Sequence, residues 1–306
     1  MHLIANKAKP FLKWAGGKAQ LLEQIIEYLP LELKLGKIKR YVEPFVGGGA
    51  LFFHIAQAYE IDEFYISDLN EELILAYKTI QQDVEELIDF LRSMERKYYR
   101  LTYNRQKEYF YAVRFQLNEN RPSINYNEYK VSWIERTAQI IFLNRTCYNG
   151  LFRVNSKGEF NVPFGKYKNP SICSEENLRS VSELLKRTEI RLGDFSNCES
   201  FVNASTFVYF DPPYRPISKT SSFTSYSLYD FDDAAQLRLA SFYRLLHRKG
   251  AKLMLSNSDP KNENPMDNFF DDVYKEFRIV RVKANRMINC NADKRGAINE
   301  LLILNY

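Results

Sequence analysis

The stretch YVEPFVGGGALFFHIA, residues 41–56, runs through three kinds of local sequence in the order strand, turn and helix. Its first residues favour a buried strand, Gly47-Gly48-Gly49 favours a tight turn, and the apolar residues that follow have helical spacing. A strand that enters a helix through glycines lets a ligand approach the backbone and the helix N-terminus. Roughly half of such turns are plain connections, so the stretch alone fits either a ligand-binding turn or a structural one.

Strand-like and helix-like segments alternate on both sides of this stretch. Short apolar runs, several without polar alternation, are typical of strands covered on both faces. These runs lie at 41–45, 64–68, 189–195, 206–210, 251–257, 273–283 and 299–306. Helical patterns lie at 18–29, 50–60, 174–187 and 232–250. The alternation predicts an α/β fold built on a mostly parallel sheet.

The alternation breaks between about residues 70 and 173. Consecutive helical patterns occupy 71–97, 103–117 and 131–143, and LFRVNSKGEFNVPFG after them is typical of a hairpin that turns at Ser156-Lys157-Gly158. The sequence therefore predicts a domain, residues 71–173, inserted between the second and third strands. Residues 1–70 and 174–306 would form the discontinuous sheet domain.

Composition excludes several classes of protein. The 306 residues are 45% apolar, with no run of about 18 apolar residues and no secretion signal at the start, which favours a cytoplasmic globular protein. The four cysteines and three histidines are scattered and form no CxxC pair. Neither a metal site nor a disulfide framework is therefore expected.

The net charge of +5 is modest, but the basic residues are clustered. Residues 92–114 hold seven Arg or Lys against two Glu, with tyrosines between them, and a second basic cluster spans 274–296. Such clusters suit the phosphates of a nucleic acid, but each is about as often only a solvated helix face.

Two segments near the glycine turn suit a nucleoside ligand. Asp68 follows the second strand, where a carboxylate can accept hydrogens from both ribose hydroxyls. In KPFLKWAGGK, residues 9–18, Lys18 would pair with the carboxylate of such a ligand. The alternative is that Trp14 is a core residue and Lys18 a solvated one. The turn lacks the GxxxxGK[ST] pattern, so a triphosphate-binding loop is not supported.

The stretch TFVYFDPPYRP, residues 206–216, ends a strand with an acid, two prolines and a tyrosine. Prolines fix their own φ, carry no N–H, and restrict the residue before them to extended conformations, so Asp211 and Pro212 would be held rigidly. These four residues, Asp211, Pro212, Pro213 and Tyr214, fit a rigid site for one planar amine. A proline-rich loop that merely ends a buried strand is the other interpretation.

Six blocks, taken in order, resemble the Dam-type (α-group, D12 class) N6-adenine DNA methyltransferases. They are KPFLKWAGGK (9–18), YVEPFVGGGALF (41–52), SDLN (67–70), NRTCYNGLFRVNSKGEFNVPFGKYKNP (144–170), GDF (193–195) and FDPPYRPISKTSSFTSY (210–226). The resemblance implies S-adenosylmethionine as methyl donor and a class I methyltransferase sheet of seven strands, the last antiparallel. It also implies that residues 71–173 form the domain that recognises double-stranded DNA.

The resemblance further implies roles for individual residues. Asp211, Pro212, Pro213 and Tyr214 would be catalytic. The cofactor would contact Trp14, Ala15, Gly16, Lys18, Glu43, Pro44, Phe45, Gly47, Gly49, Asp68, Asp194, Phe195 and Asp211, with Trp14 and Lys18 at its methionine end and Asp194 and Phe195 at its adenine. DNA would contact Arg145, Tyr148, Asn149, Leu151, Arg153, Asn155 and Pro163.

The implied reaction is methylation of N6 on an adenine that has been flipped out of duplex DNA, with Asp211 and the Pro212 carbonyl accepting the amine hydrogens. The block around Arg153 is similar to that of GATC-specific members, in which this arginine would contact a guanine. The alternatives are another DNA site, an RNA substrate, or a DNA-binding relative without activity. Residues 257–296 match no block, so the resemblance assigns them no role.

Overall fold

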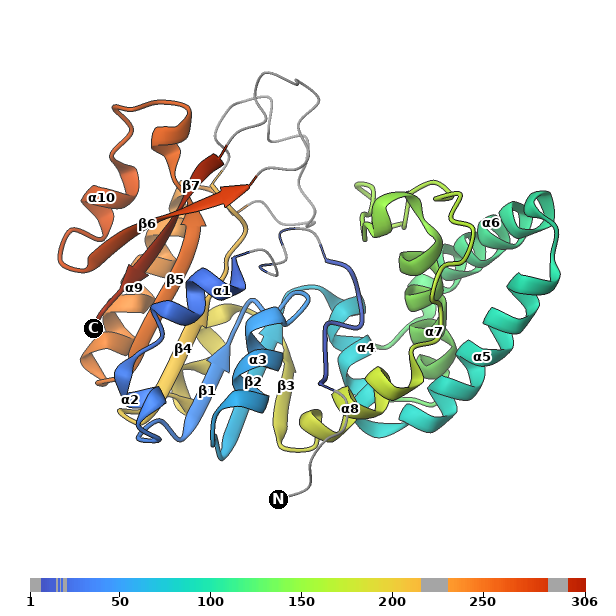
Figure 1. Cartoon of the computed structure of the whole chain (residues 1–306), viewed down its shortest axis with the longest axis horizontal. Helices are drawn as coiled ribbons and strands as arrows, with labels where there is room; N and C mark the ends of the chain where they lie inside the picture. Colours follow the sequence, from blue (N-terminus) through green and yellow to red (C-terminus); the bar gives the residue numbers. More distant parts are fainter. Residues whose placement is uncertain (1–6, 15, 17, 19–20, 216–230, 286–296) are drawn as a thin grey trace.

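A computed structural model describes residues 7–14, 16, 18, 21–215, 231–285 and 297–306. Seven strands form one sheet in the order β3-β2-β1-β4-β5-β7-β6 (Figure 1). Their bounds are β1 Arg40–Glu43, β2 Glu63–Asp68, β3 Thr188–Leu192, β4 Thr206–Phe210, β5 Lys252–Ser258, β6 Arg278–Asn285 and β7 Ala297–Leu304.

Strands β1 to β5 are mutually parallel, and β7 is antiparallel to both of its neighbours, β5 and β6. This arrangement confirms the expected α/β sheet with an antiparallel last strand. From β1 the chain builds outward to β2 and β3, then returns to place β4 on the other side of β1. The strand order thus reverses between β1 and β4, the position at which open α/β sheets bind ligands.

Ten α-helices accompany the sheet in the described part of the chain. They are α1 Leu22–Glu27, α2 Leu31–Lys34, α3 Ala50–Ala58, α4 Glu71–Gln82, α5 Val84–Arg100, α6 Tyr103–Asn120, α7 Ser132–Thr146, α8 Glu175–Leu185, α9 Asp233–Arg248 and α10 Phe269–Val273.

Several predicted elements are longer than the observed ones, such as the strand expected over 189–195, which ends at Leu192. Two others differ more. The helix expected over 71–97 is two helices, because Asp83 leaves the helical region (φ −133°, ψ 55°) and its carboxylate accepts a hydrogen bond from Tyr129. The strand expected from 273 begins at Arg278. The residues before it form α10 and a turn, which lets Tyr274 and Phe277 pack against Tyr243 of α9 at centroid distances of 5.5 and 4.9 Å.

Successive residues of the central strands enter two different hydrophobic clusters. Tyr41 and Phe207 join the cluster that includes α1 and α3, whereas Val42 and Val208 join the cluster that includes α9. Figure 1 shows α1 and α3 in front of the sheet and α9 behind it. Because a strand alternates its side chains, helices on both faces bury every residue of such strands, which explains their apolar runs.

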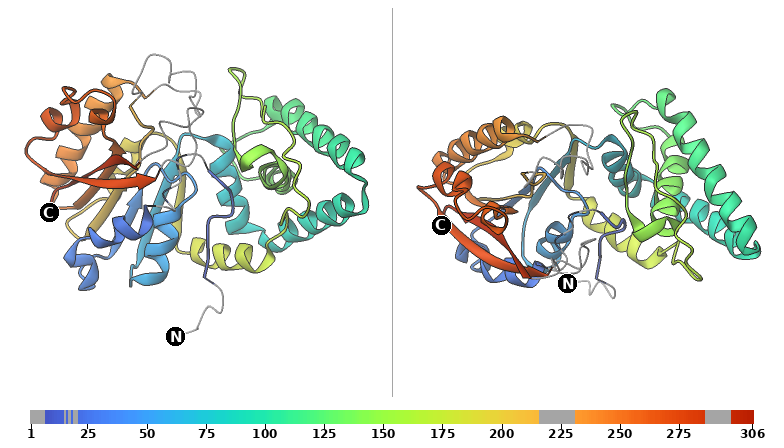
Figure 2. Two further views of the ribbon diagram at one scale, coloured as in Figure 1. Left: turned by 45° about the horizontal axis from the view of Figure 1, so that its top comes forward. Right: turned by 90° about the horizontal axis from the view of Figure 1, so that it is seen from above.

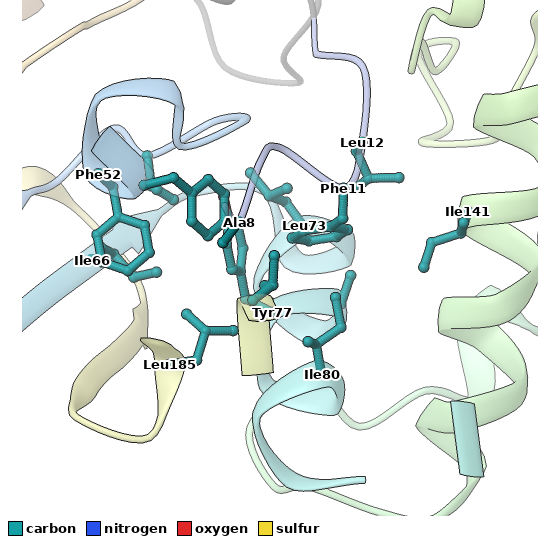
Figure 3. Close-up of a cluster of buried hydrophobic side chains, with 14 of the residues drawn as sticks. Ala8, Phe11, Leu12, Phe52, Ile66, Leu73, Tyr77, Ile80, Ile141 and Leu185 are labelled. Atoms are coloured by element: carbon teal, nitrogen blue, oxygen red, sulfur yellow. The ribbon is translucent and has the colours of Figure 1, made fainter. Parts of the chain in front are cut away.

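Helices α5, α6 and α7 stand to one side of the sheet (Figure 2). The first hydrophobic cluster continues into them without a break, from Phe52 and Ile66 through Tyr77 of α4 to Ile141 of α7 (Figure 3). Helix α4 therefore packs against both the sheet layer and the other helices. The division of the chain into residues 71–173 and the remainder stays a prediction.

The N-terminal segment, residues 8–14, connects helix α3 beside the sheet with helices α7 and α8. The backbone of Ala8 hydrogen-bonds Gln57 of α3, that of Lys9 bonds Asn177 of α8, and that of Lys13 bonds Asn144 of α7, with N–H to oxygen distances of 2.8, 2.8 and 2.9 Å. Asn144 also donates to the carbonyls of Lys13 and Gly150, each at 2.9 Å. Trp14, the next residue, therefore lies between the glycine turn and the segment that follows α7.

The predicted hairpin after α7 is confirmed. An antiparallel bridge joins Val154 to Phe160, and the Asn155 N–H donates to the Glu159 carbonyl across the turn at 2.9 Å.

None of the helices described here is long and apolar enough to cross a membrane. In the described ranges no group of His, Cys, Asp and Glu side chains is arranged to hold a metal ion.

Candidate active site

Four neighbouring strands each deliver a predicted site residue at the same edge of the sheet. The glycine turn follows β1, Asp68 ends β2, Asp194 follows β3 and Asp211 follows β4. Because these strands are parallel and adjacent, their carboxyl ends lie side by side. The fold therefore brings together segments that are far apart in the chain.

The turn after β1 requires glycine at two positions. Gly47 and Gly49 have φ of +46° and +70°, a left-handed conformation that residues with a Cβ rarely adopt. A Cβ on Gly49 would also lie 2.6 Å from the Tyr77 hydroxyl, and one on Gly47 would lie 3.0 Å from Trp14 Cδ1. The glycines let the turn pass close to α4 and to the N-terminal segment before α3 begins.

Asp68 is tied to the glycine turn. Its Oδ2 accepts from the Gly47 N–H at 3.1 Å, and its Oδ1 accepts from the Asn70 N–H at 2.9 Å. A carboxylate has about four lone-pair sites, so Asp68 can still accept from a further donor such as a ribose hydroxyl. Burial raises the pKa of Asp68 above its ordinary value, and the backbone N–H groups oppose that shift.

Asp211 is held from two sides. The Lys18 Nζ lies 2.7 Å from Asp211 Oδ1, and the Ser256 hydroxyl donates to the same oxygen at 2.9 Å. Ser256 belongs to β5, is buried, and shares a hydrogen bond of 2.9 Å with the Tyr209 hydroxyl of β4. Among the described residues both partners of the carboxylate contact Oδ1, which leaves Oδ2 for another donor.

The three residues after Asp211 are anchored as well. Gln236 of α9 donates to the Pro213 carbonyl at 3.3 Å, and the Tyr214 hydroxyl donates to the Glu300 carboxylate of β7. The buried Asn257 side chain accepts from the Arg215 N–H at 3.4 Å and contacts Gln236 at 3.4 Å. The motif is therefore held by β5, β7 and α9 in addition to its prolines.

Sequence reasoning missed these partners. Ser256 and Asn257 end the run AKLMLSN, so a signal was present: polar residues that close a buried parallel strand lie at the same edge as Asp211. This finding gives the beginning of the unassigned region 257–296 a role as a support for the motif. Gln236 and Glu300 carried no comparable signal in their local sequence.

Lys18 lies at the centre of this arrangement. Its ammonium group contacts Asp211, donates to the Gly16 carbonyl at 3.2 Å and lies 4.4 Å from the Tyr214 ring centroid. The resemblance placed Lys18 at a ligand carboxylate, whereas here its side chain points to the Asp-Pro-Pro-Tyr motif. Ala15, also expected at this place, lies outside the described residues.

Glu43, at the end of β1, is a buried acid beside the motif. Its side chain accepts a hydrogen bond of 2.6 Å from the Tyr41 hydroxyl. Burial raises the pKa of Glu43 to about 8, the nearby charge of Asp211 acts in the same direction, and the Tyr41 hydrogen bond opposes them. Pro44 continues the chain from Glu43, and its carbonyl accepts from the Ser67 hydroxyl at 3.5 Å.

The last two residues expected at the cofactor lie after β3. Asp194 forms an ion pair with Arg238 of α9, and Phe195 is buried, with ring centroids of Phe45 and Phe242 each at 5.5 Å. The Arg238 guanidinium covers the Phe195 ring at 4.1 Å. Phe45, which is only half-buried, offers more ring surface at this position than Phe195 does.

The segment after α7 presents several of the residues expected at DNA. Tyr148, Asn149, Arg153 and Pro163 are exposed. The Tyr148 N–H donates to the Pro163 carbonyl at 2.8 Å, so these two residues are adjacent, and Arg153 Nε donates to Asn161 at 2.9 Å. Their exposure leaves them accessible to a large partner.

Three other residues of that set are engaged within the protein. Arg145 is half-buried and donates to the Phe11 carbonyl at 2.8 Å. Asn155 closes the hairpin turn, because its side chain accepts from the Lys157 and Glu159 N–H groups at 2.9 and 3.0 Å. Leu151 is half-buried. In the structure the side chains of Arg145 and Asn155 thus stabilise the conformation of this segment.

Trp14 contacts both the glycine turn after β1 and the segment after α7. It packs against the glycine turn, and its ring stacks on Phe152 of the segment after α7, with centroids 5.2 Å apart and an angle of 17°. Phe152 is buried and also contacts Phe160 of the hairpin at 5.7 Å. A single aromatic side chain therefore touches both the predicted cofactor turn and the predicted DNA-contacting segment.

The basic cluster at 92–114 is only partly available to a partner. Arg92 pairs with Glu175, Arg105 pairs with Glu108 at 2.7 Å, and Arg114 donates to the Val162 carbonyl at 3.3 Å. Lys97 lies 4.4 Å from the Tyr109 ring. Part of this cluster therefore stabilises α5, α6 and the hairpin, and those side chains are neither free for a partner nor simply solvated.

Comparison with known proteins identifies the family of this chain. A family model for D12 class N6 adenine-specific DNA methyltransferases matches residues 14–288. The chain belongs to this family. It is an adenine-specific DNA methyltransferase with S-adenosylmethionine as methyl donor. The resemblance read from the sequence is thereby confirmed at the level of the family, and its GATC-specific subgroup stays a prediction.

Several members of the methyltransferase family are similar to the chain over almost its whole length. Type II methyltransferase M.MjaIII of Methanocaldococcus jannaschii is 54% identical over 98% of this chain and 100% of its own. Type II methyltransferase M1.LlaDCHI of Lactococcus lactis is 39% identical over 97% and 95%. The DNA adenine methylase of Haemophilus influenzae is 31% identical over 97% and 94%.

Proposed function

We propose that this methyltransferase acts on adenine in GATC sites of double-stranded DNA and draws the target base out of the helix. Asp211 and the Pro212 carbonyl would accept the two hydrogens of the adenine amine. The observation that carries the catalytic part of this proposal is the fixed position of the Asp-Pro-Pro-Tyr motif, held by β5, β7 and α9, next to the glycine turn.

The described residues fit S-adenosylmethionine at the carboxyl ends of β1, β2 and β3. Asp68 retains lone pairs for the ribose, and Gly47 and Gly49 expose backbone at the start of α3. Asp194 and Phe45 would contact the adenine ring. When bound, this cofactor supplies a methyl group on a positively charged sulfur. The protein's task is then to bring a weak nucleophile into line with that methyl group.

The amine of adenine is weakly nucleophilic because its lone pair is delocalised into the ring. Two acceptors on its hydrogens favour a tetrahedral nitrogen and hold it in one orientation, so positioning and electrostatics account for the rate. Asp211 need not be a strong base, because the methylated amine is cationic and loses a proton readily. The contacts from Ser256 and Lys18 keep the carboxylate in a single orientation.

Base flipping is part of the same proposal. The target atom is inaccessible within a duplex, and extrusion costs about a few kcal/mol. Stacking on Tyr214 would offset part of this cost, and the hydrogen bond from its hydroxyl to Glu300 fixes the ring. Since the Lys18 ammonium lies over this ring, the base would use the other face or displace Lys18.

Removing the Asp211 carboxylate tests the catalytic part of the proposal. We expect Asp211→Ala to abolish methyl transfer to duplex DNA while cofactor affinity, measured by calorimetry, changes little. Asp62→Ala is the matched control, because this exposed acid precedes β2 at the opposite edge of the sheet. Near wild-type transfer by Asp211→Ala would contradict the proposal.

The choice of GATC rests on the block around the exposed Arg153. Its guanidinium can donate to both O6 and N7 of a guanine, a contact worth about 1–3 kcal/mol of discrimination. Tyr148, Asn149 and Leu151 would contact or wedge base steps, and Pro163 would contact a thymine methyl. Arg145 and Asn155 would act through the shape of the segment, given their internal hydrogen bonds.

The preference for GATC can be tested by substituting Arg153 and comparing GATC with a site altered at its first base. We expect Arg153→Ala to lose its preference for GATC over sites altered at the first base, whereas Lys157→Ala, at the exposed hairpin turn, keeps it. Equal losses on both substrates would argue against Arg153 as the guanine contact. Expression in cells without adenine methylation, followed by digestion with a nuclease that methylated GATC blocks, tests the site as a whole.

The proposed DNA-recognition domain, residues 71–173, predicts a different behaviour for the basic cluster. Exposed side chains such as Arg100 and Lys107 would contact phosphates, so their loss would weaken binding to all sequences and reduce its salt dependence. Comparing transfer to duplex DNA, single strands and RNA separates this function from an RNA methyltransferase.

A further inference from the structure

Arg238 of α9 makes three contacts with the segment that follows β3. Its two terminal nitrogens donate to Asp194 Oδ1 and Oδ2 at 2.8 and 2.7 Å, a bidentate pair. Its guanidinium also lies 4.1 Å from the Phe195 ring centroid. Planar two-point pairs of this kind fix the plane of a carboxylate as well as its position.

The hydrogen bonds of Asp194 are distributed unequally between its two oxygens. Oδ1 accepts from the Ser196 N–H at 3.0 Å, from the Ser196 hydroxyl at 2.6 Å and from Arg238. Within the described part of the chain, Oδ2 has Arg238 as its partner. Since a carboxylate oxygen has two lone pairs, Oδ2 is the oxygen that can accept a further hydrogen bond.

Arg238 also influences the charge of Asp194. The hydrogen bonds from Arg238, followed by those from Ser196, lower the pKa of Asp194 to about 2 against the opposing effect of burial. The side chain is therefore an ionised acceptor with one oxygen open, at the place proposed for the adenine of the cofactor. An acceptor in this state suits an amino group and repels a carbonyl oxygen.

We propose that Arg238 is a positioning residue for the cofactor: it orients Asp194 so that Oδ2 accepts the 6-amino group of the adenine. The inference rests on the proposed placement of that adenine at Asp194. Arg238 would not contact the reacting atoms. It would instead set how well the enzyme distinguishes a 6-amino from a 6-oxo purine in the cofactor.

The test compares two ligands that differ only at that group. S-adenosylhomocysteine carries the 6-amino group, and S-inosylhomocysteine carries a 6-oxo group. Calorimetry gives the affinity of each for the wild type and for Asp194→Ala, Arg238→Ala and Arg238→Lys. The matched control is Arg244→Ala, which removes another arginine of α9 whose ion pair is with Glu276, away from this site.

We expect Arg238→Ala to weaken S-adenosylhomocysteine binding by roughly twofold to fivefold, the size expected for a half-exposed ion pair. The 6-oxo ligand should be nearly unaffected, so the preference between the two ligands falls. Arg238→Lys should recover part of the preference, and Arg244→Ala should keep all of it. A merely structural role for Arg238 would weaken both ligands equally.

The outcomes separate this inference from the placement on which it rests. If Asp194→Ala keeps the full preference for the 6-amino ligand, the adenine does not lie at Asp194, and both ideas fail. If Asp194→Ala loses the preference while Arg238→Ala keeps it, the placement stands and Arg238 has no positioning role. Equal weakening of both ligands by Arg238→Ala likewise overturns the inference.

Discussion

The Lys18 ammonium lies 2.7 Å from Asp211 Oδ1, and the Lys18 side chain is 6% exposed. A buried lysine and the central acid of the Asp-Pro-Pro-Tyr motif are therefore direct partners. Charge-assisted hydrogen bonds of this kind are stronger than neutral ones. The pair gives Lys18 a role that differs from the contact with the cofactor carboxylate implied by the family resemblance.

Substituting Lys18 distinguishes these two roles. If Lys18 chiefly orients Asp211, Lys18→Gln should lower kcat by roughly tenfold, the effect of about 1.4 kcal/mol on the barrier, with little change in the KM for S-adenosylmethionine. Steady-state kinetics on a DNA duplex measures both constants. A raised cofactor KM with an unchanged kcat would instead support pairing with the cofactor carboxylate.

The glycine turn predicts a steric coupling between Gly49 and Tyr77. Gly49→Ala should cost about 1–2 kcal/mol for the left-handed backbone and a further 1–3 kcal/mol or so for the clash with the Tyr77 hydroxyl 2.6 Å from the new Cβ. Adding Tyr77→Phe should recover the second part, less the cost of the hydrogen bond of 3.2 Å that the Tyr77 hydroxyl donates to the Gly47 carbonyl. Urea denaturation of the single and double variants measures both contributions.

Gly36 offers the control for that experiment, because it has a similar φ of +68° and a Cβ added there would meet no atom within 4 Å. Gly36→Ala should therefore show only the backbone cost. If Gly36→Ala and Gly49→Ala destabilise the protein equally, the close approach to Tyr77 contributes nothing.

Two adjacent acids at the start of α4 should differ sharply in their importance for stability. Glu72 is buried with Arg136, whose Nε donates to it at 2.8 Å and whose Nη1 donates to the Leu117 carbonyl at 2.9 Å. Removing one partner of a buried pair costs about 3–5 kcal/mol, so Glu72→Ala should lower the free energy of unfolding by that amount.

Glu71 is the matched control, because its side chain is 43% exposed and its contact with Arg121 is 3.3 Å long. Exposed pairs contribute about 0–1 kcal/mol, so Glu71→Ala should have little effect in the same denaturation experiment. Similar losses for both variants would show that the Glu72–Arg136 pair does not join α4 to α7 as described.

The buried Glu43 predicts a pH dependence of stability. Its pKa is raised by burial from 4.5 to about 8, so the folded protein holds a proton that the unfolded chain has released. Stability from this group is present below pH 4.5 and declines as the pH rises toward 8, by at most about 1.4 kcal/mol per unit. Glu43→Gln, which keeps an acceptor for Tyr41, should flatten that decline.

Denaturation by urea between about pH 5 and 8 measures this effect. Glu63→Gln serves as the control, because Glu63 begins the neighbouring strand and its side chain is 51% exposed. Parallel curves for the wild type and Glu43→Gln would mean that Glu43 does not remain protonated in the folded protein.

Much of the candidate site could be predicted from the chain because local chemistry determines it. Runs without polar alternation indicate strands covered on both faces, and the positive φ values at Gly47 and Gly49 account for the turn after β1. The two largest errors in element bounds, at Asp83 and before Arg278, arose where side chains from distant segments, Tyr129 and Tyr243, override the local pattern.

The sequence by itself determined the order of strands and helices, the family, and the positions of Asp68, Asp194 and Asp211 at strand ends, since these follow from patterns within a few residues. Only the tertiary structure decided their partners. Ser256 reaches Asp211 because the sheet places β5 beside β4. Lys18 reaches Asp211 from the segment before α1, and Arg238 reaches Asp194 from α9. Contacts across 44 to 193 residues depend on strand order and helix packing, and no local spacing records them.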